Sequence, residues 1–311
     1  MIWKALLLIV LVVMALALWV YWQYKRMTKS FPRPEFRPAK QRPSPREWGT
    51  SECHISWLGH STLLCSLGNV LFMTDPVFSP KVGVRLGPLI IGPRRYSEPG
   101  LALSDIPTPD VVLMSHAHLD HFDIPSLRKV LHPEAIVVTP KGTGRLVRRV
   151  HSGKICELSV GESVRLENGM TVESVPVRHW GNRFPWNRSY GYCGYLVEKD
   201  GARIFFAGDT AHVTHFADLR QHGTIDVACI PIGAYAPETF QGAHCTPEQA
   251  WDMFLQTGAK FLVPIHWGTF VLSQEPIDEP LHRLEQAAGS ERRRIVIRQI
   301  GEEFAFASER S

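Results

Sequence analysis

The sequence predicts an α+β domain, in which sheets pack together with helices outside them, preceded by one apolar helix. Strand-like runs dominate the chain after residue 50, and strands alternate with helices further on. Near the N-terminus, 18 consecutive residues lack charge, Gly and Pro. The chain of 311 residues is 44% hydrophobic and 21% charged, which is enough to bury a full core.

The apolar N-terminal stretch, residues 5–22, would span about 27 Å as a helix, close to the hydrocarbon thickness of a bilayer. Aromatic side chains that settle at lipid headgroups gather at its C-terminal end, at Trp19, Tyr21, Trp22 and Tyr24. The alternative is a cleaved signal peptide, because Lys4 gives a positive start and Ala15-Leu16-Ala17 resembles a cleavage site. We favour an uncleaved transmembrane helix, since the apolar run is long and bulky aromatic residues follow it.

Three regions follow from composition: a transmembrane anchor with its basic flank (1–30), a Pro-rich basic linker (31–50) and a globular domain (51–311). Five prolines in the linker predict an extended tether without a core of its own. Its basic side chains either lie on anionic headgroups or are merely solvated. Residues 1–50 carry a net charge of +7 and the remainder −3, so the basic balance does not argue for a nucleic-acid partner.

Apolar runs separated by turn residues define the first half of the globular domain. They predict strands at residues 54–58, 62–65, 70–73, 111–114 and 135–139. Helices are predicted at residues 124–131 and 142–150. Residues 76–105 are rich in Gly and Pro and form a long loop, and such loops are usually functional or disordered. The loop carries Gly92-Pro93-Arg94-Arg95-Tyr96, a candidate lip of a substrate site.

In the second half, residues 155–177 and 192–207 alternate as strands around the hairpin turns Asn168-Gly169 and Asp200-Gly201. Strands at 227–232 and 261–265 then flank a helix that starts at Pro247, with Thr246 as its N-cap and Gln249 at N3. A last helix at residues 281–288 and a closing strand at residues 294–300 complete the domain.

The segment His116-Ala117-His118-Leu119-Asp120-His121 directly follows a buried strand and holds three imidazoles and one carboxylate. His116 and His118 are two residues apart, so in an extended segment they point the same way and suit one metal ion. Asp120 and His121 come as the chain turns and can face a second ion. Imidazole and carboxylate ligands suit zinc, and also iron or manganese. A lone histidine is usually structural, but this cluster is far more specific.

Three later residues, His179, Asp209 and His266, each follow an apolar strand. Each alone would be structural more often than a metal ligand. Together with the histidine cluster, all the candidates lie at the C-terminal ends of strands or in the loop after them. Open sheet folds place their functional sites there.

This order of residues, His-x-His-x-Asp-His followed by His, Asp and His at strand ends, is similar to that of the metallo-β-lactamase superfamily. Within it, the chain resembles the N-acyl-phosphatidylethanolamine-hydrolysing phospholipase D family. The segments that match are residues 57–60, 74–78, 115–123, 179–180, 205–210, 230–235 and 265–270. The metal motif is common to the whole superfamily. The segments Ile-Pro-Ile-Gly-Ala-Tyr (230–235) and His-Trp-Gly-Thr-Phe (266–270) are what narrow the resemblance to this one family. The resemblance implies an αββα sandwich for residues 51–311.

The resemblance also implies two zinc ions, with a hydroxide between them that attacks phosphorus in a phosphodiester. The ligands it implies for the first ion are His116, His118 and His179. Those for the second are Asp120, His121 and His266, and Asp209 would bridge the two ions.

Four further roles come from matched positions in the same family. His244 and Asp120 are the predicted catalytic residues, with His244 giving a proton to the leaving group. A surface histidine near a helix start is the alternative for His244. His60 and Asp75 are predicted to orient the metal ligands, although hydrogen bonding within the fold would also explain them.

The predicted function is a membrane-anchored di-zinc hydrolase, a phospholipase D-type enzyme for phospholipids like N-acyl-phosphatidylethanolamine. A metallo-lactonase is the alternative. A non-catalytic binding module would be expected to lack a ligand, and none of the seven is missing. The membrane helix and linker depart from the animal members, and no motif matches an acyl channel. A homodimer is left open.

The orientation prediction places the catalytic domain on the cytoplasmic side of the cell (inner) membrane, as a single-pass protein. Within about 15 residues after the span there are more basic residues than before it, and this excess favours retention of the C-terminal side in the cytoplasm. The basic residues after the span are Lys25, Arg26, Lys29, Arg33 and Arg37. Six cysteines without a C-x-x-C pair fit a reducing compartment, with an unrecognised disulfide as the alternative.

Overall fold

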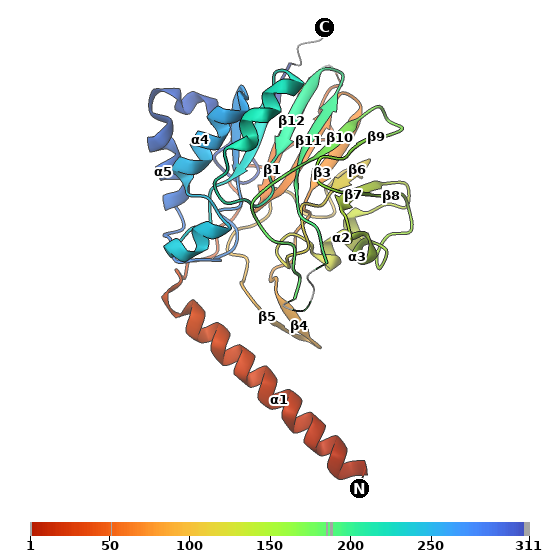
Figure 1. Ribbon diagram of the computed structural model, residues 1–311, viewed down its shortest axis with the longest axis vertical. Helices are drawn as coiled ribbons and strands as arrows, with labels where there is room; N and C mark the ends of the chain where they lie inside the picture. Colours follow the sequence, from red (N-terminus) through yellow and green to blue (C-terminus); the bar gives the residue numbers. More distant parts are fainter. Residues whose placement is uncertain (1, 51, 185, 187–188, 308–311) are drawn as a thin grey trace.

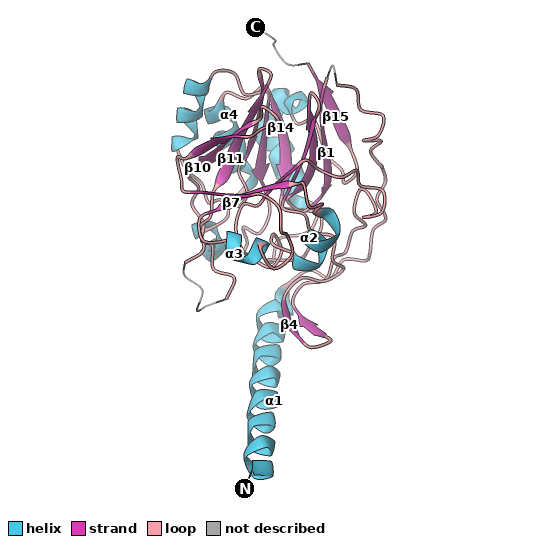
Figure 2. Ribbon diagram, turned by 90° about the vertical axis from the view of Figure 1, so that its right-hand side faces the viewer, coloured by secondary structure: helices cyan, strands magenta, loops and turns pink. Residues whose placement is uncertain are grey.

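The computed structural model describes residues 2–50, 52–184, 186 and 189–307. Two sheets lie face to face, with helices on their outer sides, and one long helix projects from the globular part (Figures 1 and 2). This is the predicted α+β αββα sandwich, which is therefore confirmed. The predicted start of the domain at residue 51 lies outside the described residues, and the first strand begins at Cys53.

The first sheet has seven strands in the order β15-β1-β2-β3-β6-β7-β8. Its first four strands pair antiparallel, whereas β3, β6, β7 and β8 pair parallel. The strands are β1 (Cys53–Gly59), β2 (Thr62–Leu67), β3 (Val70–Thr74), β6 (Val111–Leu113), β7 (Ile136–Pro140), β8 (Ile155–Leu158) and β15 (Glu303–Phe306).

The second sheet has six strands in the order β14-β13-β12-β11-β10-β9. Because β10 and β12 both pair antiparallel with β11, they run in the same direction, and β13 and β14 continue parallel to β12. The C-terminal ends of β10, β12 and β14 therefore lie at one edge. The strands are β9 (Ser163–Arg165), β10 (Thr171–Val175), β11 (Gly194–Lys199), β12 (Ala202–Phe206), β13 (Val227–Pro231) and β14 (Phe261–Ile265).

Apolar side chains from both sheets meet in the central core, where Phe72 of the first sheet and Phe206 of the second are fully buried. Two outer cores lie beneath the helices. The α-helices of the globular part are α2 (Ile124–Val130), α3 (Gly144–Val147), α4 (Pro247–Thr257) and α5 (Glu279–Ala288). The 3-10 helices are η1 (Thr28–Ser30), η2 (His215–His222), η3 (Glu238–Gly242) and η4 (Gly289–Arg294).

The projecting helix is α1 (Ile2–Met27), drawn in red in Figure 1. None of its described residues is buried, and it is long and apolar enough to cross a membrane. A signal sequence near the N-terminus meets the same criteria of length and composition. The helix is thus a candidate membrane span, as the sequence predicted.

The linker after α1, predicted as an extended tether without a core of its own, lies along the globular domain. The backbone N–H of Arg37 donates to the carbonyl of Tyr96 at 2.7 Å, and its guanidinium pairs with Asp278 at 2.6 Å. Trp48 stacks on His54 with ring centroids 5.1 Å apart. These contacts fasten the linker to the domain.

The predicted closing strand at residues 294–300 is wrong, because the strand that closes the sheet is β15. The Glu302 carboxylate accepts hydrogen bonds from the backbone N–H groups of Arg298 and Gln299, which removes them from any ladder. The helix predicted at residues 142–150 is shorter, forming only α3. Within the predicted loop, β4 (Val84–Leu86) and β5 (Leu89–Ile91) form a small hairpin.

Candidate metal centre

The seven residues predicted as metal ligands lie together at one edge of the sandwich. The His116–His121 loop follows β6, and the other three residues follow β10, β12 and β14. The shared direction of these last three strands explains why side chains so far apart in sequence meet. The members are His116, His118, Asp120, His121, His179, Asp209 and His266.

The first group of ligand atoms belongs to His116, His118 and His179, and all three atoms lie within 4.8 Å of one another. Nδ1 of His118 lies 2.8 Å from Nε2 of His116 and 3.2 Å from Nε2 of His179. The Nδ1 atoms of His116 and His179, which point away from the cluster, each have a hydrogen-bond partner. Nδ1 of His116 lies 2.9 Å from the Ser115 hydroxyl, and Nδ1 of His179 donates to the Ala243 carbonyl at 3.0 Å. These partners turn both Nε2 atoms inward.

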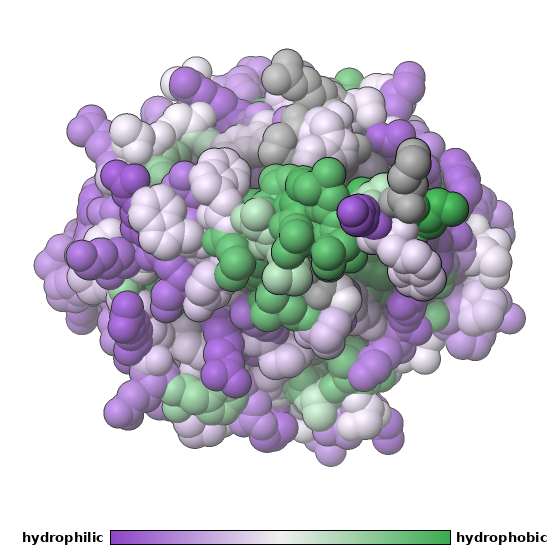
Figure 3. All heavy atoms as spheres, turned by 90° about the horizontal axis from the view of Figure 1, so that it is seen from below, coloured by the Kyte–Doolittle hydropathy of each residue, from purple (hydrophilic) through white to green (hydrophobic). Residues whose placement is uncertain are grey.

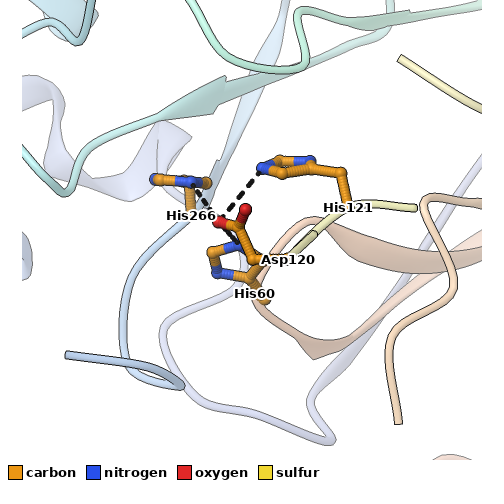
Figure 4. A group of neighbouring side chains, drawn as sticks. All are labelled: His60, Asp120, His121 and His266. Carbon is orange, nitrogen blue, oxygen red and sulfur yellow. Dashed lines mark hydrogen bonds and ion pairs between the residues drawn. The ribbon is translucent and has the colours of Figure 1, made fainter. Parts of the chain in front are cut away.

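The second group gathers His121 and His266 around Asp120, with His60 beside them (Figure 4). Oδ2 of Asp120 lies 3.7 Å from Nε2 of His121 and 3.7 Å from Nε2 of His266. It also lies 3.1 Å from Nε2 of His60. Burial lowers the pKa of His60 to about 3, so this imidazole is neutral and can donate its Nε2–H to Asp120. His60 thus occupies the place from which the sequence predicts that it orients a ligand.

Asp209 lies between the two groups. Its Oδ2 atom is 3.1 Å from Nε2 of His121 and 3.1 Å from Nε2 of His266. The same atom is 3.9 Å from Nε2 of His116 and 3.8 Å from Nε2 of His179. This is the position that a bridging carboxylate needs, and the bridging role itself stays a prediction.

The donor set fits divalent cations because several buried ligand atoms lack a hydrogen bond, although Asp209 lies close to two of them. Nε2 of His121, Nε2 of His266 and Oδ1 of Asp209 have no hydrogen-bond partner within the described part of the chain. Buried polar atoms are almost always partnered, so such a convergence of unpartnered atoms calls for an explanation. A pair of cations would satisfy them, and imidazole with carboxylate suits zinc, iron or manganese.

Charge and burial set the protonation of these groups. Burial holds the pKa of His116 and His179 well below the usual value, so both are neutral, as ligands must be. For Asp209, burial would raise the pKa, but His121 and His266 outweigh it and hold the carboxyl well below its usual range. For His266, burial acts to lower the pKa, but Asp209 and Asp120 raise it to about 9.

Asp75 supports the cluster from behind and is completely buried. One carboxylate oxygen accepts the backbone N–H of Ser115 at 2.7 Å, and the other accepts the Ser115 hydroxyl at 2.5 Å. Nδ1 of His121 lies 2.7 Å from Oδ2 of Asp75. Asp75 therefore fixes both the loop and one of its rings. Ser115 was missed as a functional residue, because a single serine before a histidine has no distinctive pattern.

Three residues of the site have left-handed backbone conformations that side chains other than glycine rarely adopt. The φ angles are 53° at His60, 32° at Asp75 and 60° at His266. Such strain is typical of functional sites, where the surrounding structure enforces it. The surrounding fold therefore holds the backbone of these three residues in conformations that they would rarely adopt on their own.

His244 joins the centre, although it lies in the segment between η3 and α4. Its Nδ1 atom is 4.0 Å from Oδ2 of Asp209, and its ring stacks on His266 with centroids 5.3 Å apart. Its side chain is 13% exposed, so the alternative of a surface histidine does not describe it. Burial lowers the pKa of His244 to about 4 despite the nearby Asp209.

Trp180 and Arg183 complete the surroundings, and the sequence analysis assigned neither a role. Trp180 is 45% exposed and stacks on His179 with centroids 4.4 Å apart, so it lies at the solvent side of the centre. Arg183 donates to the carbonyls of Ala117 and Phe122 at 3.1 and 2.8 Å and so braces the histidine loop. Contacts to carbonyls leave no sequence signal, since every residue offers one.

Comparisons with known proteins identify the family to which this fold belongs. A family model described as "Beta-lactamase superfamily domain" matches residues 70–267. An uncharacterised protein of Mycobacterium tuberculosis is 34% identical over 249 residues, covering 78% of this chain and 65% of that protein. The chain thus matches a little under two thirds of that relative.

An N-acyl-phosphatidylethanolamine-hydrolysing phospholipase D of Caenorhabditis elegans is 31% identical over 246 residues, covering 74% of this chain and 68% of the nematode protein. Among solved structures, a metallo hydrolase of Ignicoccus hospitalis has a TM-score of 0.61 and 20% identity. That match covers 83% of this chain and all of the archaeal one, and it supports the fold. The chain belongs to the metallo-β-lactamase superfamily, and within it the chain is similar to proteins named as metal-dependent hydrolases and as phospholipases D that hydrolyse N-acyl-phosphatidylethanolamine.

Proposed function

We propose that the protein is a membrane-anchored phosphodiesterase of the phospholipase D type, acting on phospholipids like N-acyl-phosphatidylethanolamine. The observation that carries this proposal is the position of Asp209 between two groups of imidazoles whose ligand atoms converge. Such a site suits two cations, and paired cations suit a phosphodiester because they face both the attacking and the leaving oxygen. The similarity to the nematode enzyme supports the choice of lipid.

The residues would hold the cations in two sets joined by Asp209. The histidines of the first group would hold one ion. Asp120, His121 and His266 would hold the other. Zinc bound there would lower the pKa of water and neutralise charge on the phosphoryl oxygens.

The chain's own groups would then manage the proton. The oxygen of water bonds to phosphorus, and the bond from phosphorus to the head-group oxygen breaks. Asp120 is oriented by His60, and its side chain is 18% exposed, so it can accept a hydrogen bond from the incoming water. His244 is neutral at pH 7 because burial lowers its pKa to about 4, so it would take up the proton that the attacking water loses and pass it to the leaving oxygen. The products would be phosphatidic acid and an N-acylated amino alcohol.

The membrane part of the proposal rests on α1. We propose that α1 remains as a single-pass anchor in the inner membrane, with the catalytic domain in the cytoplasm. The exposure of its apolar side chains fits a helix that lies in lipid. Basic residues after the span would face an anionic leaflet, at about 1 kcal/mol each near the surface.

The proposed activity can be tested with the purified full chain. Metal content per chain is measured first, and turnover is then compared on N-acyl-phosphatidylethanolamine, phosphatidylcholine and a panel of lactones. We expect about two metals per chain and release of phosphatidic acid from the N-acylated lipid. Lactone hydrolysis without lipid hydrolysis would instead support a metallo-lactonase and overturn the phospholipase proposal.

A further inference from the structure

A groove of about 810 Å³ lies between the C-terminal end of α1 and the loop that precedes β6. One wall belongs to the anchor and the linker, with Tyr24 and Phe31 among its residues. The opposite wall belongs to the globular domain and includes Phe78 and Arg94. The groove therefore exists only because the membrane helix and the catalytic domain meet there.

The linker contacts hold these two walls against each other. Arg37 and Tyr96 are joined through their backbones, and the backbone N–H of Glu98 returns a hydrogen bond to the Arg37 carbonyl at 2.8 Å. Phe31, at the start of the linker, is only 9% exposed. The groove is thus part of the folded protein rather than a gap beside a loose helix.

We propose that this groove binds one phospholipid of the surrounding membrane, with its apolar chains in the groove and its phosphate at a basic rim. The proposal rests on the membrane anchorage proposed above and does not depend on the hydrolytic reaction. Tyr24 lies near the C-terminal end of a candidate membrane span, so any groove beside it opens at the depth of the headgroups. Lipid is the molecule in contact with that position.

The apolar lining supports the acyl part of the ligand. Phe31, Phe36 and Phe78 line the groove with Tyr24 and several prolines. Phe36 is 64% exposed, which is unfavourable in water but favourable against a lipid chain. Figure 3 views the molecule from below, the side on which the exposed apolar helix α1 projects, and shows hydrophobic side chains at the middle of the view with polar ones around them.

The charged rim supports the phosphate. Lys25, Arg33 and Arg94 line the groove and are exposed, and none pairs with an acidic side chain in the described residues. Residues 76–97 carry four basic residues and no acidic one. Basic side chains beside a membrane attract anionic lipid at short range. The rim therefore favours a phospholipid with net negative charge over a neutral one.

The groove is separate from the metal centre but shares a wall with its surroundings. Arg95 lines the groove, is 6% exposed, and lies over the Phe270 ring at 5.0 Å. The Phe270 ring in turn lies nearly perpendicular to the His60 ring, with the two ring centroids 5.3 Å apart. One guanidinium nitrogen of Arg95, Nη1, has no hydrogen-bond partner among the residues the structure describes. A buried cation at this wall also suits an anionic ligand.

The test is photo-cross-linking of the full chain in phosphatidylcholine nanodiscs that contain phosphatidylglycerol with a diazirine in its acyl chain. Mass spectrometry then maps the labelled peptides. We expect label on the peptides that carry Phe36 and Phe78, in addition to label along α1. Replacing Arg94→Glu should reduce label at Phe78 about fivefold. The matched control is Arg165→Glu, an exposed arginine on β9, which should leave the label unchanged.

Thermal unfolding first establishes that the variants are folded. Phe36→Ser then provides an independent change in the apolar lining of the groove, and it should also reduce the label at Phe78. Label confined to α1 would show that lipid surrounds the helix but does not enter the groove, and would overturn the proposal. If a diazirine phosphatidylcholine labels the groove as strongly as the phosphatidylglycerol probe, and Arg94→Glu does not change that label, the preference of the basic rim for anionic lipid is refuted. Cross-links between two chains at Phe36 would assign the groove to a second copy. Failure to co-elute with nanodiscs would refute the anchor itself, independently of any activity.

Discussion

Asp75 Oδ2 and His121 Nδ1 lie 2.7 Å apart, although 46 residues separate them in the sequence. The contact points Nε2 of His121 toward Asp209, where it lies 3.1 Å from the Oδ2 atom of that carboxylate. Asp75 also holds Ser115, the residue before the histidine loop. One buried carboxylate therefore positions a predicted metal ligand and the backbone of the loop that carries the other ligands.

We expect Asp75→Asn to weaken metal affinity by about 10–100-fold, because the amide is a poorer acceptor for the His121 ring. Metal affinity is measured by competition with a chelating dye. The matched control is Asp123→Asn, since Asp123 is also buried and also accepts serine hydroxyls, from Ser79 and Ser126. Equal losses in both variants would point to general destabilisation and count against a specific orienting role.

Replacing Asp209→Asn should abolish most turnover and lower the metal content more than Asp120→Asn does. Asp209 lies between both groups of imidazoles, and a neutral amide cannot balance two cations there. Metal content per chain, by elemental analysis, and turnover decide the matter. Two metals per chain with near-normal turnover in the Asp209 variant would refute the bridging assignment.

Replacing His244→Ala should keep the metals and slow turnover by about 10²–10⁴-fold if the residue transfers a proton. The diagnostic measurement is a series of phosphodiesters with leaving groups of increasing acidity. A proton donor matters least for the best leaving group, so the deficit should shrink along the series. A constant deficit would show that His244 positions the phosphate by hydrogen bonding instead.

Metal uptake by the metal-free protein should release protons and strengthen as pH rises. Asp209 and Asp120 outweigh burial and raise the pKa of His266 to about 9, so below that pH its ring carries a proton that a metal must displace. Affinity should therefore climb between pH 7 and 9. Calorimetry in buffers of different ionisation enthalpy counts the protons, and a binding enthalpy independent of buffer at pH 7 would contradict this.

The catalytic domain should lie on the cytoplasmic side of the membrane, because the basic excess follows the span. Lys25, Arg26 and Lys29 come directly after it, against Lys4 and the amino terminus before it. Reporters fused after residue 311 give the measurement. Fluorescence from a fluorescent-protein fusion is expected, whereas activity from an alkaline phosphatase fusion would place the domain outside.

Local patterns predicted packed sheets with helices outside and placed the candidate ligands at strand ends, whereas the family resemblance implied the αββα sandwich itself. Each predicted ligand follows an apolar strand, and the strand C-termini meet at one edge because β10, β12 and β14 run the same way. The hairpin turns at Asn168-Gly169 and Asp200-Gly201 were also correct, since β9 pairs with β10 and β11 with β12 around them. In these places the local sequence and the fold favour the same structure.

Contacts that depend on tertiary structure could not be predicted. The strand expected at residues 294–300 has a suitable pattern, yet Glu302 takes up two of its N–H groups. The β4–β5 hairpin lies within a Gly- and Pro-rich stretch whose composition predicts a loop. The residues around Asp75 in the sequence do not indicate that its carboxylate contacts His121. Only the family resemblance predicted that Asp75 lies near the metal ligands.

The fastened linker alters how an anchored enzyme would meet its substrate. A loose tether lets a domain sample a volume of solution, whereas the Arg37 contacts with Tyr96 and Asp278 would hold this one at a fixed height above the bilayer if α1 is its anchor. Encounters then take place in two dimensions, by lateral diffusion. The rate of hydrolysis would depend on the mole fraction of substrate in the host membrane and not on its bulk concentration. Adding inert lipid to the membrane would therefore slow the enzyme, even with the total amount of substrate unchanged.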